Sequence, residues 1–287
     1  NFIFTVWDLA HKKIPYFPEL RQNFAFETRE QLYSQLLSKA AAIIVGHDFA
    51  RDDLIKYYHL EKNKIFKIPF KPSPKLVEYD KKPPQQTSPI FSEDFPNEYV
   101  YYPAQYIAHK NHHIILKAFA KLKDEGHNDL GLILTGSDKG NLKFLKTLVK
   151  DYEIGSLVQF MPFQTDENVY SIFKGASALI MPSYIGPATL PTMEAFHLNI
   201  PLVMPNSLEN LAFYKDACIF YDAYDAEDLA KQIMAIKSLG KKRLALLEKA
   251  KARYQEILKS SELIELFEYL CRFEIILKSY DQSMEKY

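Results

Sequence analysis

Short apolar runs alternate with helically spaced apolar positions over residues 99–236. The run at 132–134 is continuous, as in strands covered on both faces, and the apolar positions of residues 169–176 fall at i, i+3, i+4 and i+7, the spacing of one helix face. The pattern predicts strands at 100–104, 130–135, 158–163, 178–182, 201–204 and 218–221, and helices at 113–123, 142–152, 169–176, 189–198, 211–216 and 226–236. Since such alternation produces parallel βαβ units, we expect a doubly wound, Rossmann-like parallel sheet of the α/β class.

The first 70 residues follow the same pattern in shorter form. Strands are predicted at 2–6, 42–45 and 64–70, and helices at 28–39, where Thr28 and Gln31 form a capping-box pattern, and at 48–58. Residues 71–96 are rich in proline and read as a linker. Residues 241–287 are expected to form C-terminal helices with an apolar seam at Leu263, Phe267, Leu270, Phe273 and Leu277. The domains expected are therefore 1–70, 97–240 and a helical tail, with 71–96 between the first two.

Composition excludes several classes of protein. The 36 basic residues balance 36 acidic ones, so no global field attracts nucleic acid, and we expect no nucleic-acid partner. The residues show no apolar run of about 18 positions and no signal-peptide pattern, and Cys218 and Cys271 lack metal-type spacing. We expect a soluble cytoplasmic protein. Because the chain opens on a strand without Met, we also expect it to be a fragment.

Polar loops follow three predicted strands, at residues 103–112, 135–141 and 181–196. In an open parallel sheet the carboxyl ends of the strands bind ligands, and helix N-termini there bind phosphate. Lys110 could contribute a positive charge to a diphosphate, and Glu194 could accept hydrogen bonds from ribose hydroxyls. The diphosphate is expected to bind at the turn where the predicted helix 189–198 begins. This turn consists of Gly186, Pro187, Ala188, Thr189 and Leu190. Gly136 and Ser137 are candidate contacts in the second loop.

Each of these signals has a plainer structural interpretation. A Gly- and Ser-containing loop is usually only a turn, Lys110 could be a solvated lysine, and Glu194 a carboxylate on a helix face. His109, His112 and His113 straddle a helix start without a partnering cysteine, so we expect no metal site there. The placement of the candidates on three strand ends of one sheet favours the functional interpretation.

The segment from Met181-Pro182-Ser183 through Gly186-Pro187 to Glu194-Ala195-Phe196 resembles the signature of the retaining family 4 (group 1) glycosyltransferases, which have the GT-B fold. Residues 103–111, 136–141, 158–163 and 4–19 are similar to that family in order and spacing. The resemblance implies that 97–240 is the domain that binds the nucleotide sugar. It also implies that 1–70 is a remnant of the acceptor-side domain, and that the tail returns toward this remnant.

The resemblance also implies the chemistry. A sugar would pass with retention from a nucleotide-sugar donor to a glycan or lipid-linked acceptor, without a metal or other cofactor, as in surface polysaccharide assembly. Glu194 would hold the ribose, Lys110 the diphosphate, and Phe163 would border the base. Asp8 and His11 are the catalytic candidates. A missing N-terminal part could provide peripheral contact with the inner face of a membrane.

Three positions depart from the family pattern. Gly186 replaces the usual first acidic residue, Gln105 an arginine before the lysine, and Trp7 the histidine of the first domain. A non-catalytic nucleotide-sugar-binding subunit is therefore the alternative function. A sugar-nucleotide epimerase is a third, which the segment from Pro182 to Glu194 argues against. The base, the sugar and the acceptor are left open.

Overall fold

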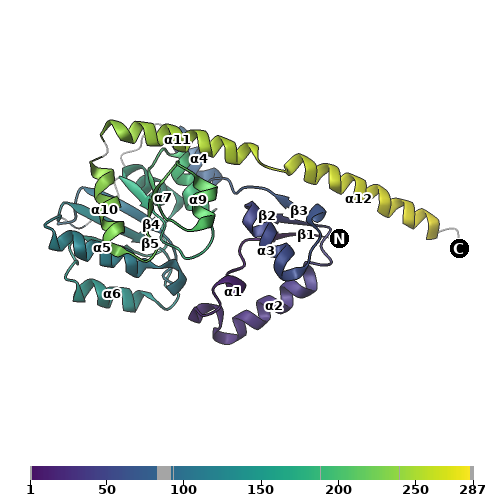
Figure 1. Cartoon of the computed structure of the whole chain (residues 1–287), viewed down its shortest axis with the longest axis horizontal. Helices are drawn as coiled ribbons and strands as arrows, with labels where there is room; N and C mark the ends of the chain where they lie inside the picture. The colour runs from purple at the N-terminus through teal and green to yellow at the C-terminus, as the bar shows by residue number, and fades with distance from the viewer. Residues whose placement is uncertain (1, 83–91, 93, 188, 239, 285–287) are drawn as a thin grey trace. The chain divides into compact units, whose positions relative to one another are not determined.

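A computed structural model describes residues 2–82, 92, 94–187, 189–238 and 240–284. The chain forms two compact units, one of residues 1–70 with 256–287 and the other of residues 71–255. We call them unit 1 and unit 2. Figure 1 labels most of their helices and several of their strands. Within the described part of the chain, every helix falls short of the apolar length that a bilayer span requires.

Unit 1 contains a three-stranded parallel sheet in the order β1-β2-β3. Its strands are β1 (Ile3–Val6), β2 (Ala42–Val45) and β3 (Ile65–Lys67), and its helices are α1 (Ala10–Lys13), α2 (Ala25–Leu36), α3 (Asp48–Tyr58) and α12 (Leu263–Met284), with 3-10 turns at Pro18–Leu20, Gln22–Phe24 and Lys62–Lys64. One face of the sheet packs on a core that includes Val6, Tyr33, Leu37, Ile43 and Leu54. On the other face, Ala42 and Phe66 pack against Leu266 of α12.

The capping box expected at Thr28 is wrong. Helix α2 begins at Ala25, so Thr28 lies inside its first turns. The chain enters the helix through Asn23 and Phe24, whose φ angles of 54° and 57° are left-handed. These two residues set the start of the helix in place of a side-chain cap.

The apolar seam expected on the tail is also corrected. Leu266, Tyr269 and Leu270 pack on the sheet, whereas Leu263 and Phe267 are 53% and 69% exposed. Glu262, directly before α12, accepts a hydrogen bond of 2.8 Å from the Lys67 backbone N–H and pairs with Arg51. This anchor fixes the rotation of the helix and therefore which apolar residues face the sheet.

We predict that Glu262→Gln lowers the free energy of unfolding of unit 1 by about 1–2 kcal/mol at neutral pH, because it removes a charge-assisted hydrogen bond. Burial alone would raise the pKa of Glu262, but the Arg51 guanidinium and the Lys67 N–H outweigh it and lower the pKa. A carboxyl group whose pKa is lower in the folded than in the unfolded protein stabilises the fold at pH values above its unfolded pKa. This stabilisation is lost as pH falls through the folded-state pKa. The difference between the two proteins should therefore vanish in acid.

Urea denaturation followed by tryptophan fluorescence measures this effect, since the single tryptophan of the chain, Trp7, lies in unit 1. Glu265→Gln, at an exposed carboxylate in the first turn of α12, is the matched control and should shift the transition less, because it loses only its interaction with the helix dipole. Equal stability of the wild type and the Glu262 variant at neutral pH would contradict the anchor.

Unit 2 contains a six-stranded parallel sheet in the order β6-β5-β4-β7-β8-β9. The strands are β4 (Glu98–Pro103), β5 (Leu130–Thr135), β6 (Val158–Met161), β7 (Ala178–Ile180), β8 (Leu202–Pro205) and β9 (Ile219–Tyr221). The helices are α5 (His112–Asp124), α6 (Leu142–Asp151), α7 (Asp166–Gly175), α8 (Leu190–His197), α9 (Leu208–Tyr214), α10 (Ala226–Lys237) and α11 (Lys241–Lys259), with a 3-10 turn at Ala108–Lys110 (Figure 1). Every residue of β5 is buried. The predicted doubly wound α/β sheet is confirmed.

The first part of the expected linker is a helix. Residues Pro74–Lys81 form α4, whose Leu76 is buried. The Tyr79 ring stacks on that of Tyr170 in α7, with centroids 6.0 Å apart, and the Asp80 carboxylate lies 3.1 Å from Lys174 Nζ. Proline at the helix start is compatible with helix geometry, so proline density alone did not distinguish this helix from a linker. Residues 83–91 and 93 lie outside the described residues.

Candidate functional site

The strand order of unit 2 reverses between β4 and β7. The chain proceeds from β4 outward through β5 and β6 on one side, then returns to β7 and continues outward through β8 and β9 on the other. The connections that follow β4 and β7 therefore lead to opposite sides of the sheet. In doubly wound sheets this switch point is where ligands bind. The first and third predicted loops follow these two strands.

Hydrogen bonds tie the loop after β4 to the loop after β5. The Tyr106 N–H donates to the Ser137 carbonyl over 3.0 Å, and the Lys139 N–H donates to the Tyr106 carbonyl over 3.2 Å. Gly136 permits this close approach, since a Cβ on it would lie 2.2 Å from the Ala104 carbonyl oxygen. The two loops thus form one backbone surface.

The loop after β4 is also joined to the loop after β7. The Asn111 side-chain Nδ2 donates to the Pro182 carbonyl over 3.2 Å, and the Tyr184 N–H donates to the His109 carbonyl over 3.2 Å. All three loops predicted from the sequence therefore adjoin at one edge of the sheet.

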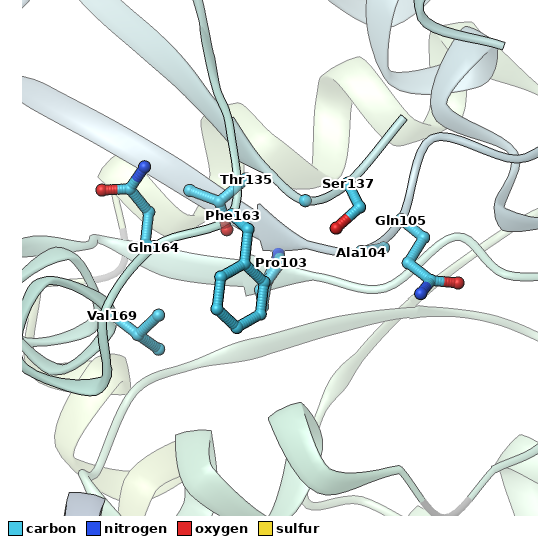
Figure 2. A pocket seen from close by; sticks show the side chains of 9 residues that line it. Pro103, Ala104, Gln105, Thr135, Ser137, Phe163, Gln164 and Val169 are labelled. Atoms are coloured by element: carbon cyan, nitrogen blue, oxygen red, sulfur yellow. The ribbon is translucent and has the colours of Figure 1, made fainter. Parts of the chain in front are cut away.

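A pocket of about 250 Å³ opens beside these loops, on the β5 and β6 side of the switch point. Figure 2 shows the side chains that line it. Gly136, Ser137 and Phe163, all predicted to contact a ligand, line this pocket, as does Gln105. Phe163 is 80% exposed, so its ring face is accessible to a flat partner.

Glu194 lies in α8, and its side chain is buried. Its Oε1 accepts a hydrogen bond of 3.3 Å from the Ser73 N–H, directly before α4. Burial raises the pKa of Glu194, and the Ser73 N–H opposes this rise. A buried carboxylate is costly for a fold, and a carboxyl group with a perturbed pKa at a ligand-binding edge is a candidate functional residue.

The turn from Gly186 to Leu190 is held from beneath by Tyr214. Its buried hydroxyl donates to the Pro187 carbonyl and lies 2.8 Å from Thr192 Oγ1. The Thr189 N–H donates to Thr192 Oγ1 over 3.3 Å, so it is already used within the protein. The contribution of Thr189 to a diphosphate cradle stays a prediction, and in this structure its N–H is engaged within the turn. The physical reason is that the helix supplies its own cap.

The remaining residues of this turn differ in how accessible they are. Gly186 has a φ of 79° with open space on its Cβ side, and Leu190 is 44% exposed at the start of α8. Pro187 is buried. Ala188 lies outside the described residues. Among the described residues of the turn, Gly186, Thr189 and Leu190 are at least partly exposed.

Lys110 ends the 3-10 turn that follows β4, and its side chain is half-buried. Its carbonyl accepts a hydrogen bond of 2.8 Å from the Tyr102 hydroxyl, which fixes the turn to the strand. Burial, with a smaller contribution from the positive charge of Lys110, lowers the pKa of His112 to about 3. The ammonium group therefore exerts its field on the start of α5.

His109, His112 and His113 lie at or just before the start of α5, and the expected absence of a metal site there stays a prediction. His112 is fully buried, and its ring lies against Tyr102 and Tyr106 at centroid distances of 4.8 and 5.3 Å. Among the residues that the structure describes, no group of three or more histidine, cysteine or acidic side chains could hold a metal ion.

The two catalytic candidates, Asp8 and His11, lie in unit 1. His11 is 1% exposed and its Nε2 lies 3.1 Å from the Tyr58 hydroxyl. Burial, together with the Arg29 cation, lowers the pKa of His11 to about 4. Asp8 Oδ1 lies 2.9 Å from Arg29 Nη2 and accepts from the Ala10 N–H over 2.8 Å. Burial argues against proton transfer by His11 to a substrate; the catalytic role of Asp8 stays a prediction.

Residues 87–253, more than half of the chain, match the model of the family "Glycosyl transferases group 1". The chain belongs to this family. The membership predicted from the segment around Glu194 is thereby confirmed.

Two curated relatives share part of their length with this group 1 glycosyltransferase chain. O-antigen chain mannosyltransferase B of Escherichia coli is 22% identical over 219 residues, which are 76% of this chain and 57% of the relative. D-inositol 3-phosphate glycosyltransferase of Pseudarthrobacter chlorophenolicus is 28% identical over 131 residues, 44% of this chain and 31% of the relative. The chain thus matches at most about three fifths of either relative.

Solved structures share the fold. WaaG, a glycosyltransferase involved in lipopolysaccharide biosynthesis, has a TM-score of 0.69 at 16% identity, covering 91% of this chain and 74% of WaaG. Anabaena HepE in complex with UDP and glucose has a TM-score of 0.66 at 15% identity, covering 91% and 69%. Sucrose-phosphate synthase from Thermosynechococcus elongatus has a TM-score of 0.69 at 19% identity, covering 96% and 68%.

Sequence reasoning missed three residues of this group 1 site, namely Ser73, Asn111 and Tyr214. Each acts on a residue distant in the chain, since Ser73 bonds Glu194, Asn111 bonds Pro182 and Tyr214 bonds Pro187. Hydrophobic periodicity carries no signal for such contacts. The one available hint was that Asn tolerates the left-handed φ of 57° that Asn111 adopts at the start of α5.

Proposed function

We propose that the protein is a glycosyltransferase whose unit 2 holds the nucleotide-sugar donor at the switch point. The pocket lined by Gly136, Ser137 and Phe163 would accommodate the base, and Glu194 would accept hydrogen bonds from the ribose. Lys110 and the start of α8 would face the diphosphate. The observation that carries the proposal is the buried Glu194 carboxylate at an edge where three polar loops adjoin.

The chemistry follows from where charge develops. When the bond between the sugar and the diphosphate breaks, negative charge builds on the departing phosphate oxygens. A fixed cation such as Lys110 and the positive end of a helix stabilise this charge most where water is excluded. These groups would do so without a metal ion, and we propose transfer with retention at the anomeric carbon.

The proposed acceptor is a glycan or a lipid-linked sugar. The similarity to an O-antigen chain mannosyltransferase supports this class, and the related fold of WaaG, which acts in lipopolysaccharide biosynthesis, is compatible with it. Surface polysaccharide or glycoconjugate assembly is therefore the proposed process.

A non-catalytic nucleotide-sugar-binding subunit is the second candidate. Gly186 and Gln105 replace charged residues of the family pattern, and His11 is buried in unit 1. Donor hydrolysis separates the two candidates, because a transferase releases free nucleotide slowly from a nucleotide sugar whereas a binding subunit leaves the donor intact.

We predict that the chain binds one of UDP, GDP, ADP or dTDP in EDTA and that Lys110→Ala weakens this binding. The loss should be about 1–3 kcal/mol, the contribution of one charged hydrogen bond, or roughly fivefold to 150-fold in Kd. A thermal-shift panel identifies the nucleotide, since binding raises apparent stability in proportion to ln(1 + [L]/Kd). Calorimetry then measures Kd for the wild type and the variant.

Lys117→Ala, an exposed lysine on α5, is the matched control and should bind as the wild type does. If Lys110→Ala binds the nucleotide with wild-type affinity, Lys110 does not belong to the donor site. Binding that is lost in EDTA would overturn the metal-independent mechanism, and binding of none of the four nucleotides would overturn the donor site itself.

A further inference from the structure

Glu194, the buried carboxylate of the candidate site, is held by the backbone at the start of α4. The Ser73 N–H donates to Glu194 Oε1 over 3.3 Å, and Ser73 directly precedes that helix. The first N–H groups of a helix have no acceptor within it, so this group is available to a side chain elsewhere. A glutamate carboxylate rotates broadly about its last bond when it is free. A hydrogen bond to one oxygen therefore also sets the direction of the other, Oε2.

The backbone that presents this N–H has little conformational freedom. Ser73 stands between Pro72, which is buried, and Pro74, the first residue of α4. A proline restricts the residue before it to extended backbone, and Ser73 has a φ of −52° and a ψ of 130°. Toward α4, all of which the structure describes, the Ser73 side chain makes no capping hydrogen bond. What this residue contributes is therefore its N–H, presented from a fixed segment.

Helix α4 is itself held against α8, the helix that carries Glu194. Near the far end of α4, Asp80 Oδ2 lies 3.6 Å from Nε2 of His197, which is one turn after Glu194 in α8. Leu76, between the two contacts, is buried. Contacts at both ends of α4 to one helix thus keep the Ser73 N–H opposite Glu194.

We propose that Ser73 is a positioning residue of the donor site, whose N–H orients the Glu194 carboxylate so that Oε2 meets the hydroxyls of the ribose. The role of Glu194 toward the ribose rests on the proposed function, whereas the orientation of its carboxylate by Ser73 does not. A binding group is effective when a neighbour locks its geometry before the ligand arrives. Because only the N–H is used, residue 73 can be of any type except proline.

The same hydrogen bond acts on the charge of Glu194. Burial is the largest influence and raises the pKa of Glu194, the Ser73 N–H opposes this rise, and the charge of Asp166 adds to it. Asp166 is itself offset by Lys75, whose Nζ lies 3.1 Å from Asp166 Oδ2. Tyr101 of β4 stays neutral, since burial raises its pKa. Because an N–H bonded to a carboxylate favours the ionised form, loss of the Ser73 N–H should raise the pKa of Glu194 further.

NMR of the wild-type chain tests the contact without any change at Ser73. The Ser73 amide proton should shift with pH at the same midpoint as the Glu194 carboxyl carbon, since a bonded N–H senses the charge of its acceptor. This shift should be absent from Glu194→Gln, whose side chain does not titrate. A Ser73 amide that does not follow Glu194 overturns the proposal.

Two variants of Ser73 then test the consequence for binding. Ser73→Pro deletes the N–H at a φ that proline allows, near about −65°, and Ser73→Ala, the matched control, keeps the N–H. By calorimetry with UDP, GDP, ADP and dTDP, Ser73→Pro should bind the preferred nucleotide roughly twofold to tenfold more weakly at neutral pH. Its affinity should also begin to weaken at a higher pH than that of the wild type. Ser73→Ala should match the wild type in both respects.

The outcomes separate this proposal from the donor site. Equal losses of affinity in Ser73→Pro and Ser73→Ala, or a pH profile that Ser73→Pro does not move, overturn the positioning role. If Ser73→Pro does not fold, the amide titration of the wild type decides. Should the wild type bind none of the four nucleotides while the Ser73 amide follows Glu194, the donor site fails and the orientation of Glu194 by Ser73 stands.

Discussion

Glu194→Gln is expected to weaken nucleoside diphosphate binding by about 1–3 kcal/mol, because a neutral amide accepts hydrogen bonds from ribose hydroxyls less strongly than a carboxylate. The same substitution should not destabilise the unliganded protein. Glutamine has the same shape and its Oε1 can still accept from the Ser73 N–H, while the burial of a charge is removed. A residue kept for binding at a cost to the fold should behave in this way, and a purely structural residue should not.

The dependence on pH follows from the raised pKa of Glu194, of which burial is the largest cause. A folded-state pKa above the unfolded value favours the protonated group, so this residue stabilises the fold at low pH and the stabilisation is lost as pH rises through the folded pKa. Nucleotide affinity should change in the opposite sense and weaken as pH falls toward this pKa from above. The Gln variant should lack both trends.

Calorimetry and thermal melts over a pH series measure both properties. Glu125→Gln, at an exposed carboxylate after α5, is the control and should match the wild type in affinity. If Glu194→Gln melts well below the wild type at neutral pH while it binds nucleotide normally, Glu194 is structural and the donor site is misassigned.

Gly136→Ala is expected to have the second large effect. The new Cβ would lie 2.2 Å from the oxygen and 2.7 Å from the carbon of the Ala104 carbonyl. Both atoms are backbone, so the loops after β4 and β5 must separate. Overpacking of this kind costs typically about 1–3 kcal/mol, or a Tm lower by roughly 2–4 °C for each kcal/mol in a protein of this size. Because these loops line the pocket, nucleotide affinity should fall as well.

Gly155→Ala provides a matched control, since no atom lies within 4 Å of the Cβ position and no left-handed φ is recorded there. Its Tm and nucleotide affinity should equal those of the wild type. An unchanged Tm in Gly136→Ala would mean that the close approach to Ala104 is not required for the fold.

Much of the fold could be predicted from hydrophobic periodicity. The runs that became β7 and β8 are continuous, apolar and buried, and β5 is buried along its whole length, as expected for strands covered on both faces of a parallel sheet. Predictions that relied on short polar patterns were less secure. Thr28 resembled a helix cap but lies within α2, and the prolines at residues 72–74 indicated a linker but precede and begin α4. The preference of one or two residues for a helix cap or a turn is small, and the packing of the whole segment easily outweighs it.

The sequence predicted which loops form the candidate site, but not which individual groups in those loops are accessible to a ligand. Glu194 and the loops after β4, β5 and β7 were found because a strand followed by polar residues and a helix is a local pattern. Whether a backbone N–H is free to bind a ligand cannot be read from a local sequence pattern, because it depends on the hydrogen bonds that the folded chain makes. Thr189 uses its N–H within its own turn, and Tyr214 supports that turn from α9.

The sequence by itself determined that polar loops would meet at one edge of a parallel sheet, because parallel strands carry their carboxyl ends to the same side. Only the tertiary structure decided which groups face that edge and which are buried or hydrogen-bonded within the protein. Ser73 bonds Glu194 across 121 residues of sequence, His11 is enclosed in the core of unit 1, and Gly46 brings Phe70 to Trp7. Such contacts depend on how distant segments pack, and packing is a property of the whole chain that no local run of residues encodes.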